Sequence, residues 1–175
     1  MNYGLIYNCD TANGPGLRVS LFVSGCTHHC PGCFNAQTWD FNFGQPYTEQ
    51  IQTDILDMLD NSYIQGLTIL GGEPMEPQNQ PAVYGLVKAV RERLPEKDVW
   101  IYSGYTFEEL QNPEARCYTA NTHDILSLID VLVDGRFVMA EKDVTLTFRG
   151  SRNQRILDAK ASLKASKPCW VEHYR

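Results

Sequence analysis

Three cysteines fall within eight residues, in the run Cys26-Thr-His-His-Cys30-Pro-Gly-Cys33. Thiolates spaced so closely can hold one iron–sulfur cluster, and a cluster of four irons takes four ligands. Three thiolates would leave one iron open to a substrate or cofactor, which indicates chemistry rather than electron storage. Pro31 removes a backbone donor and Gly32 admits conformations closed to other residues, so the run is expected to form a loop.

A structural zinc site is the alternative interpretation of these cysteines. Zinc takes four ligands, and His28 or His29 would have to supply the fourth at implausibly tight spacing. We expect the two histidines to shape the loop or to face a partner. The remaining cysteines are scattered along the chain and are expected to be ordinary thiols: Cys9, Cys117 and Cys169.

The size of the chain fits a single domain covering residues 1–175, of which 43% are hydrophobic and 21% charged. A chain of this length buries about 70% of its unfolded surface, so it needs no disulfide framework to fold. The N-terminus shows no basic stretch followed by a long apolar run. We therefore expect a soluble cytoplasmic protein without a membrane span.

The net charge is −6, from 15 Lys and Arg against 21 Asp and Glu. An acidic balance works against non-specific nucleic-acid binding, so no nucleic-acid partner is expected. The one candidate for a local basic patch is formed by Arg149, Arg152 and Arg155.

Predicted strands and helices alternate along the chain. β-branched and apolar stretches predict strands at 17–23, which would be the first, and at 67–70, 99–102, 130–133, 144–148 and 154–157. Helical spacing and capping residues predict helices after Thr48, from Pro81 to Leu94, at Thr106–Glu109 and up to Ile129. This alternation predicts an α/β fold with mostly parallel strands. Because a complete (β/α) barrel needs about 250 residues, the chain has room for a partial barrel only.

Three motifs lie just after predicted strands, namely Gly71-Gly-Glu-Pro74, Tyr102-Ser-Gly-Tyr105 and Asp134-Gly-Arg136. The cysteine run follows the strand at 17–23 in the same way. In an open parallel sheet, ligands bind beyond the carboxyl ends of the strands. The four segments are therefore expected to form one site.

The cysteine spacing and these motifs together resemble the radical S-adenosylmethionine (radical SAM) superfamily. In detail they resemble its branch of activating proteins for anaerobic ribonucleoside-triphosphate reductase, which are glycyl-radical-enzyme activases. The resemblance extends over most of the chain and includes Asn13-Gly-Pro-Gly-Leu-Arg18, Cys30-Pro-Gly-Cys-Phe-Asn35 and Arg149-Gly-Ser-Arg-Asn-Gln154. It implies a partial (β/α) barrel with a [4Fe-4S] cluster at its open top, held by Cys26, Cys30 and Cys33.

The resemblance also implies contacts with S-adenosylmethionine. Its amino group would be held by backbone oxygens and an acidic side chain of Gly71, Gly72, Glu73 and Pro74. Its adenine would lie against Gly32 and Phe34, next to Cys33. Many superfamily members carry the aromatic residue before the last cysteine, whereas Phe34 follows it, and core packing is the alternative role for this ring.

Further positions correspond to the surroundings of the ribose and of the methionine carboxylate. A carboxylate accepts hydrogen bonds from ribose hydroxyls, and a guanidinium pairs with a carboxylate. Structural capping is the alternative role for each of them. The residues are Ser103, Gly104, Asp134 and Arg136, with Asn153 and Gln154 as weaker candidates.

In the resembled family, one electron splits S-adenosylmethionine into methionine and a 5′-deoxyadenosyl radical, which removes a hydrogen atom from a glycine of the partner reductase. The resemblance thus implies an oxidoreductase that activates the large subunit of the anaerobic reductase. No second cysteine motif for an auxiliary cluster is present, so an external electron donor such as a flavodoxin is expected. Three alternatives remain: an activase of a formate-lyase type enzyme, a radical SAM enzyme acting on a small metabolite, and a non-catalytic iron–sulfur or zinc module.

Overall fold

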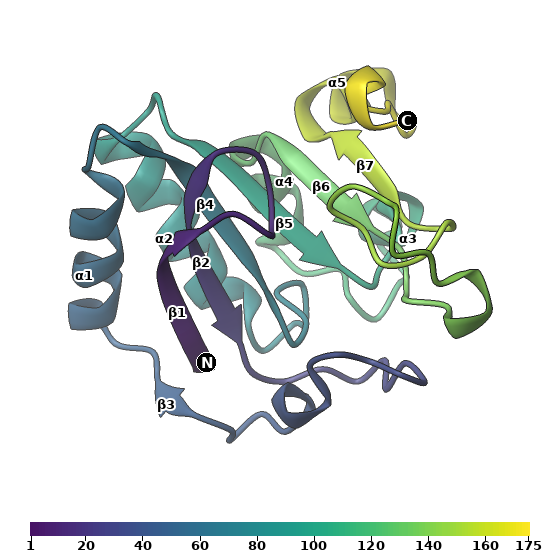
Figure 1. The fold of residues 1–175 in the computed structure, drawn as a ribbon, viewed down its shortest axis with the longest axis horizontal. Helices are drawn as coiled ribbons and strands as arrows, with labels where there is room; N and C mark the ends of the chain where they lie inside the picture. Colours follow the sequence, from purple (N-terminus) through teal and green to yellow (C-terminus); the bar gives the residue numbers. More distant parts are fainter.

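A computed structural model describes all 175 residues. Seven strands form one open sheet in the order β3-β1-β2-β4-β5-β6-β7, and its four central strands, β2, β4, β5 and β6, are parallel (Figure 1). The predicted α/β class with a partial barrel is confirmed. The strands are β1 (Asn2–Asp10), β2 (Leu17–Val23), β3 (Gln45–Pro46), β4 (Ile64–Gly71), β5 (Asp98–Ser103), β6 (Val131–Asp134) and β7 (Arg155–Asp158).

Five α-helices connect or follow these strands. Thr48 accepts a hydrogen bond from the Ile51 N–H at the start of α1, and Thr106 with Glu109 forms a capping box at the start of α3, as predicted. None of the five combines the length and the apolar character that a membrane crossing needs. The helices are α1 (Glu49–Leu59), α2 (Gln80–Arg93), α3 (Phe107–Gln111), α4 (Thr122–Leu128) and α5 (Ala159–Ala165), with short 3₁₀ turns at Ala36–Trp39, Met139–Glu141 and Glu172–Tyr174.

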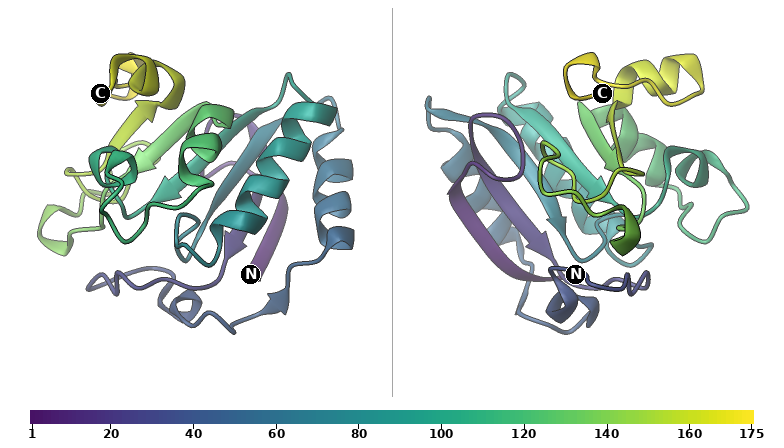
Figure 2. Two further views of the ribbon diagram at one scale, coloured as in Figure 1. Left: turned by 180° about the vertical axis from the view of Figure 1, so that it is seen from behind. Right: turned by 45° about the vertical axis from the view of Figure 1, so that its right-hand side comes forward.

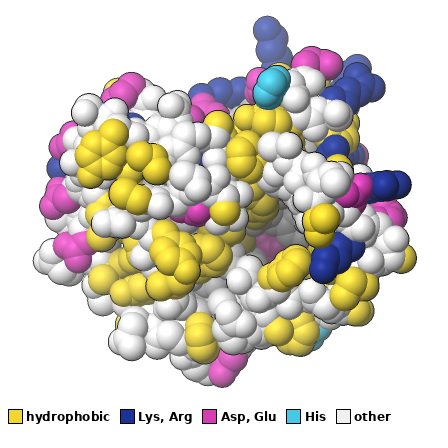
Figure 3. Space-filling model, in the orientation of Figure 1, with side chains coloured by type: hydrophobic (Ala, Val, Ile, Leu, Met, Phe, Trp, Pro, Cys, Tyr) yellow, Lys and Arg dark blue, Asp and Glu magenta, His cyan; other side chains and the backbone are white.

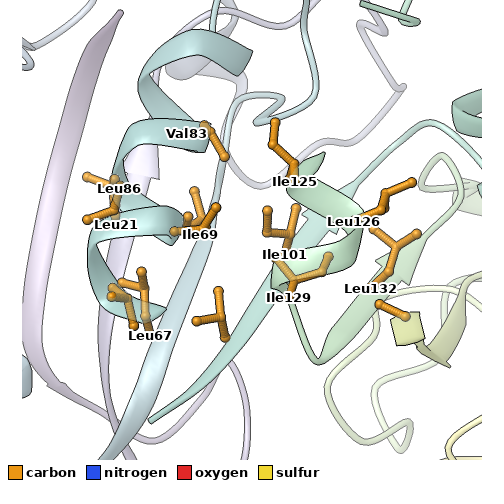
Figure 4. Packing of buried hydrophobic residues seen from close by; sticks show 14 of the residues in the cluster. Leu21, Leu67, Ile69, Val83, Leu86, Ile101, Ile125, Leu126, Ile129 and Leu132 are labelled. Carbon is orange, nitrogen blue, oxygen red and sulfur yellow. The ribbon is translucent and has the colours of Figure 1, made fainter. Parts of the chain in front are cut away.

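The main hydrophobic core lies between the sheet and helices α1, α2 and α4, which cover one face of it (Figure 2). Successive side chains of a strand point to opposite faces. Leu21, Ile69 and Ile101 are in register on neighbouring strands and meet the helices, among them Leu86 of α2 (Figure 4). The opposite face carries a smaller cluster around Trp100.

Two features of the sheet differ from the prediction. The strand at 17–23 forms, but it is the second strand, because β1 precedes it and pairs with it in antiparallel fashion. Two register irregularities in β1 interrupt its pairing, and its exposed side chains blur the apolar alternation. The strand near 154–157 also forms, as β7, but it runs antiparallel to β6.

The predicted strand at 144–148 is wrong. This segment forms turns and bends, and the side chain of Val144 is 87% exposed. Phe148 has a φ of 53°, a left-handed conformation that a strand does not contain. Phe148, one of the apolar residues that suggested a strand, packs instead against Trp100 and Tyr174.

Candidate cluster and cofactor site

A cavity of about 150 Å³ opens at the carboxyl ends of the parallel strands. The molecular surface is hollowed at this place (Figure 3). The loops after β2, β4, β5 and β6 all contribute to its lining, as expected for an open parallel sheet. The predicted site residues that line it are Cys26, Cys30, Cys33, Gly71, Gly72, Glu73, Ser103, Gly104 and Gln154.

The three clustered cysteines share this cavity. Cys26 comes shortly after β2 and is buried, whereas Cys30 and Cys33 are half-buried. No three His, Cys, Asp or Glu side chains converge closely enough to hold a single metal ion. A cluster distributes its thiolate ligands over several irons rather than around one centre. Three thiols on the wall of one cavity therefore fit a cluster as a donor set.

The environment of the cysteines keeps two of their thiols protonated in cluster-free protein. Burial raises the pKa of Cys26 to about 12, against the smaller opposing effect of backbone N–H groups of His28 and His29. Burial also raises the pKa of Cys30, opposed by the N–H of Phe137. Because only the thiolate binds metal, cluster assembly at neutral pH must release these protons.

Glu73 ties three of the loops together. Its side chain is 1% exposed. Its Oε1 accepts hydrogen bonds from the Met75 N–H and the Ser103 hydroxyl, both at 2.8 Å, and its Oε2 accepts one from the Gly104 N–H at 2.6 Å. The Nε2 atom of His28 lies 2.9 Å from the same Oε2. A carboxylate offers about four acceptor positions, so protein donors already use those of Glu73.

The two glycines before Glu73 bring the backbone close to the cavity. Gly71 has a φ of 103°, a region that favours glycine, and a Cβ there would lie 2.8 Å from the Phe22 backbone. A Cβ on Gly72 would lie 2.7 Å from the Gly25 carbonyl oxygen. No protein N–H donates to the carbonyl of Gly72, which leaves this oxygen available to a ligand. Pro74 is buried next to them and does not line the cavity.

His28 links the cysteine loop to two strand ends. Its Nδ1 accepts a hydrogen bond from Arg136 Nε at 3.2 Å, while its Nε2 faces Glu73. Since a guanidinium only donates, Nδ1 must be the acceptor and Nε2 must carry the proton. Gly104 lies directly against the imidazole, where a Cβ would approach it to 2.4 Å. The ring therefore fits only because residue 104 has no side chain.

Two of the predicted ribose and carboxylate contacts lie outside this cavity. The Asp134 carboxylate is fully buried, accepts from the Phe107 N–H at 2.6 Å and pairs with Arg155 at 2.5 Å. The capping alternative thus describes Asp134, which holds the start of α3. Arg136 pairs with Glu109 at 3.0 Å and reaches the cavity only through His28.

The predicted adenine contacts lie at the rim. Phe34 is 72% exposed, so the core alternative for this ring is wrong. Its ring centroid is 6.0 Å from that of Phe137, and Lys142 Nζ lies 5.0 Å from the centroid of Phe34. Gly32 is exposed and has a φ of 75°.

The remaining candidates have structural partners. Gln154 lines the cavity, but its side chain bonds the backbone of Gly135 and Gly150, and the Asn153 amide donates to the Arg136 carbonyl. The three arginines considered as a basic patch are dispersed among separate partners. Arg149 stands over Trp170, Arg152 pairs with Asp143, and Arg155 pairs with Asp134 and Glu108.

Several residues around the cavity escaped the sequence analysis. The Asn79 amide donates to the Ser24 carbonyl at 3.0 Å and to the Glu73 carbonyl at 2.9 Å, joining the end of β2 to the segment after β4. Glu76 is 1% exposed and contacts Thr27. One available signal was a second acid three residues after Glu73. The other missed residues are Trp39, which lines the cavity, and Arg116, which lines the pocket next to it.

The chain is similar to known proteins over most of its length. The family described as "4Fe-4S single cluster domain" matches residues 12–157, which include every residue of the cavity. The anaerobic ribonucleoside-triphosphate reductase-activating protein of Escherichia coli (strain K12) is 44% identical over 156 residues, 88% of this chain and 96% of that protein. Proteins of the same name from Enterobacteria phage T4 and Vibrio cholerae are 44% and 43% identical over 158 residues, covering 89% of this chain and 93% and 97% of those proteins.

Proposed function

The chain belongs to the family of anaerobic ribonucleoside-triphosphate reductase-activating proteins, and we propose on this ground that it activates such a reductase by generating a glycyl radical on it. It is a radical SAM oxidoreductase with a [4Fe-4S] cluster. The observation that supports this most directly is the meeting of three cysteines and the Gly71-Gly-Glu-Pro74 segment at one cavity. Neither segment alone would specify both a cluster and a cofactor.

In the proposed site, Cys26, Cys30 and Cys33 hold the cluster and leave one iron without a protein ligand. The bound cluster supplies one electron that cleaves S-adenosylmethionine to methionine and a 5′-deoxyadenosyl radical, and this radical takes a hydrogen atom from the Cα of a reductase glycine. The protein contributes position and electrostatics to this chemistry. An external one-electron donor such as a flavodoxin reduces the cluster.

The residues after β4 and β5 orient S-adenosylmethionine. The free carbonyl of Gly72 accepts a hydrogen bond from its ammonium group. The absence of side chains at Gly71 and Gly72 lets this segment pack closely against the backbone of Phe22 and Gly25 in the cavity wall. Glu73 contributes negative charge at this place while holding Ser103 and Gly104 in the cavity wall. Because the four acceptor positions of Glu73 are in use, its direct contact with the ammonium requires the displacement of one protein donor.

The other residues predicted to contact S-adenosylmethionine lie at the rim of the cavity or behind the residues that line it. Gly32 and Phe34 provide a surface for the adenine, close to Phe137. Arg136 orients the wall through His28, and Asp134 does so by fixing the start of α3.

The proposal is tested by anaerobic reconstitution with iron and sulfide, followed by incubation with a purified anaerobic reductase, a reductant and S-adenosylmethionine. We expect 5′-deoxyadenosine and a glycyl-radical signal in electron paramagnetic resonance (EPR). Cys30→Ala should lose the cluster and both products, whereas Cys9→Ala, at an exposed cysteine outside the cavity, should retain them. A radical on a formate-lyase type enzyme but none on the reductase would overturn the proposed partner.

A further inference from the structure

A second cavity lies beside the cluster cavity. Its volume is about 510 Å³, against about 150 Å³ for the cluster cavity, and it is lined mainly by the loops after β2 and β5 and by the segment between α3 and α4. One residue lines both cavities, and this residue is His28. The two cavities therefore meet at His28.

The two nitrogens of the His28 ring face residues of different cavities. Nε2 lies 2.9 Å from Oε2 of Glu73, which lines the cluster cavity. Nδ1 accepts a hydrogen bond at 3.2 Å from Nε of Arg136, which lines the second cavity. The rest of the ring is enclosed in the same way. A Cβ on Gly104, in the cluster cavity, would come within 2.4 Å of it, and the Tyr105 ring, in the second cavity, lies 4.4 Å from it between centroids.

The imidazole thus stands between the two cavities, and it fills the space there. The His28 side chain is 6% exposed, so protein atoms surround it almost completely. Gly104, which packs against the ring, has no side chain that would fill the space if the ring were removed. A cavity left inside a protein in this way can be entered by a small molecule of similar size. Replacement of the ring by a methyl group should therefore join the two cavities.

A buried thiol lies on each side of this boundary. Cys26 lines the cluster cavity and is 8% exposed, whereas Cys117 lines the second cavity and is 1% exposed. Neither of them lines both cavities. The reactivity of each thiol therefore reports on access to its own cavity.

The second cavity is suited to water and small polar solutes. Charged and partly exposed side chains line it, among them Glu109, Arg116 and Arg136. The cluster cavity, in contrast, contains the three cysteines that are expected to hold the cluster. Solvent exposure is one of the properties that set the behaviour of an iron–sulfur cluster. The boundary between the cavities therefore bears on how well the cluster is shielded.

We propose that the His28 ring is a barrier that keeps water and small polar solutes of the second cavity away from the cluster. The inference rests on the proposed [4Fe-4S] cluster. It adds to the proposed function, in which His28 serves only to connect Arg136 to the cavity wall. The ring acts through its volume, while its contacts with Glu73 and Arg136 hold it in place.

The test compares two variants of His28 in cluster-free protein under anaerobic, reducing conditions. His28→Ala removes the ring, whereas His28→Leu keeps a side chain of similar size but loses both hydrogen bonds, and it remains a test if His28→Ala does not fold. His123→Ala is the matched control, because it removes the imidazole of an exposed histidine on α4. Each protein is treated with iodoacetamide, with and without added imidazole. Peptide mass spectrometry gives the alkylation rate of each cysteine.

In His28→Ala we expect Cys26 to be alkylated about tenfold faster or more, which corresponds to about 1.4 kcal/mol in the free energy of opening. Cys117 should keep its wild-type rate. Added imidazole should refill the space and slow Cys26 again in this variant alone. In His28→Leu and His123→Ala, Cys26 should react at a rate close to that of the wild type.

Three outcomes would overturn the barrier. One is a wild-type rate of Cys26 in His28→Ala. Another is equal acceleration of Cys26 and Cys117, or acceleration that imidazole does not reverse, since a loosened protein would then explain the effect. The third is a His28→Leu protein in which Cys26 reacts as fast as in His28→Ala, or clearly faster than in the wild type, because hydrogen bonds rather than ring volume would then close the cavity.

A second measurement, on reconstituted protein, separates the inference from the proposed function. Hydrogen peroxide is added, and the loss of cluster absorbance is followed. We expect faster loss in His28→Ala, slowed by imidazole, and a rate close to the wild type in His28→Leu. An unchanged rate in His28→Ala would overturn the protective role and leave the proposed function standing. If the wild type assembled no cluster, the proposed function would fail, whereas the alkylation rates would still decide whether the ring separates the cavities.

Discussion

The two ends of the parallel strands differ in the charged groups that they bury. At the amino ends two cations, Arg18 and Lys97, are buried and donate to backbone carbonyls, beside one buried carboxylate, that of Asp10, which accepts from the Ser20 hydroxyl. Arg18 is fully buried and bonds the Leu67 carbonyl at 2.9 Å, and Lys97, 7% exposed, bonds the Ile64 carbonyl at 2.7 Å. At the carboxyl ends the buried charges are carboxylates, which accept from backbone N–H groups.

Three carboxylates occupy that second end. Glu73 accepts from the Gly104 N–H, Glu76 from the Thr27 N–H and Asp134 from the Phe107 N–H. Of these N–H groups, only that of Phe107 belongs to a helix N-terminus, where N–H groups have no partner within the helix, whereas those of Gly104 and Thr27 belong to loops. At both ends, buried charges are thus satisfied in part by backbone groups.

The two ends also differ in the side chains and loops that their buried charges contact. The partners of Arg18 at the amino end, such as Thr68 and Asp98, belong to the sheet itself. The partners of Glu73 and Glu76 belong to loops that line the cluster cavity or adjoin it. We infer that the amino end stabilises the fold, while the carboxyl end holds the chemistry.

Replacing Arg18 by Met should have the largest effect and should act on stability alone. The substitution leaves the 2.5 Å partner Asp98, the Thr68 hydroxyl and the Leu67 carbonyl without their donor. Breaking a buried ion pair in this way costs about 3–5 kcal/mol. Urea unfolding of the cluster-free protein measures the loss. The EPR spectrum of the reconstituted variant, recorded at a temperature where it is folded, should be that of the wild type; an altered spectrum would contradict the division between the ends.

Glu73→Gln should instead lower activity at the opposite end. The amide places an NH₂ group against donors such as the Gly104 N–H and His28 Nε2, so at least one contact is lost. A hydrogen bond to a charged group contributes about 1.5–3 kcal/mol, and 1.4 kcal/mol corresponds to about tenfold in rate. We expect 5′-deoxyadenosine formation to fall at least about tenfold.

The exposed Glu92→Gln serves as its control, since it removes the same charge from the surface of α2. Unfolding curves are needed beside the activity assay. A Glu73→Gln protein that lost stability but kept full activity would place Glu73 with the structural charges of the amino end.

A smaller effect on stability is expected when the pH is lowered, and it should come from Asp130 at the amino end. Asp130 lies just before β6; burial works to raise its pKa, but hydrogen bonds from Lys160, the Val99 N–H and Arg91 outweigh burial and hold the pKa below its usual value. A lowered carboxyl pKa contributes stability that is complete above about pH 4 and is lost as the pH falls through the folded-state value. The free energy of unfolding should therefore drop more steeply below pH 4 in the wild type than in Asp130→Asn. If the free energy of unfolding fell equally with pH in the wild type and in Asp130→Asn, the ion pairs of Asp130 would contribute nothing to stability.

The sequence was sufficient to predict the carboxyl end better than the amino end. Cysteine spacing and glycine motifs after apolar strands indicated which loops would meet, because strand ends in a parallel sheet converge whatever the details of packing. Arg18 carried no comparable signal. A basic residue in a strand is usually exposed, and only the register that places it opposite Gly66 and near Asp98 makes it buried.

Side-chain roles within the site were harder to predict than its location. Asp134 matches the family pattern in sequence and Phe34 is displaced from it by its place after the last cysteine, but neither fact showed that Asp134 is buried under Arg155 and that Phe34 is exposed at the rim. Such differences depend on rotamers and on partners distant in the chain. The antiparallel direction of β7 and the turns at 144–148 were missed for a related reason, since Phe148 has a left-handed φ and packs on Trp100, a residue distant in the chain.

The smallest effect on stability and activity should come from an exposed ion pair on helix α2, away from both ends of the parallel strands. Lys88 and Glu92 are one turn apart on the exposed side of α2, with 3.8 Å between charged atoms and side chains 53% and 67% exposed. Solvent screens such a pair, and it is worth about 0.3–0.5 kcal/mol. Lys88→Gln should therefore change neither urea unfolding by more than about 0.5 kcal/mol nor 5′-deoxyadenosine formation. If this variant matched Arg18→Met in lost stability, charge itself, rather than its burial among backbone carbonyls, would account for the amino end, and the contrast between the two ends would have no basis.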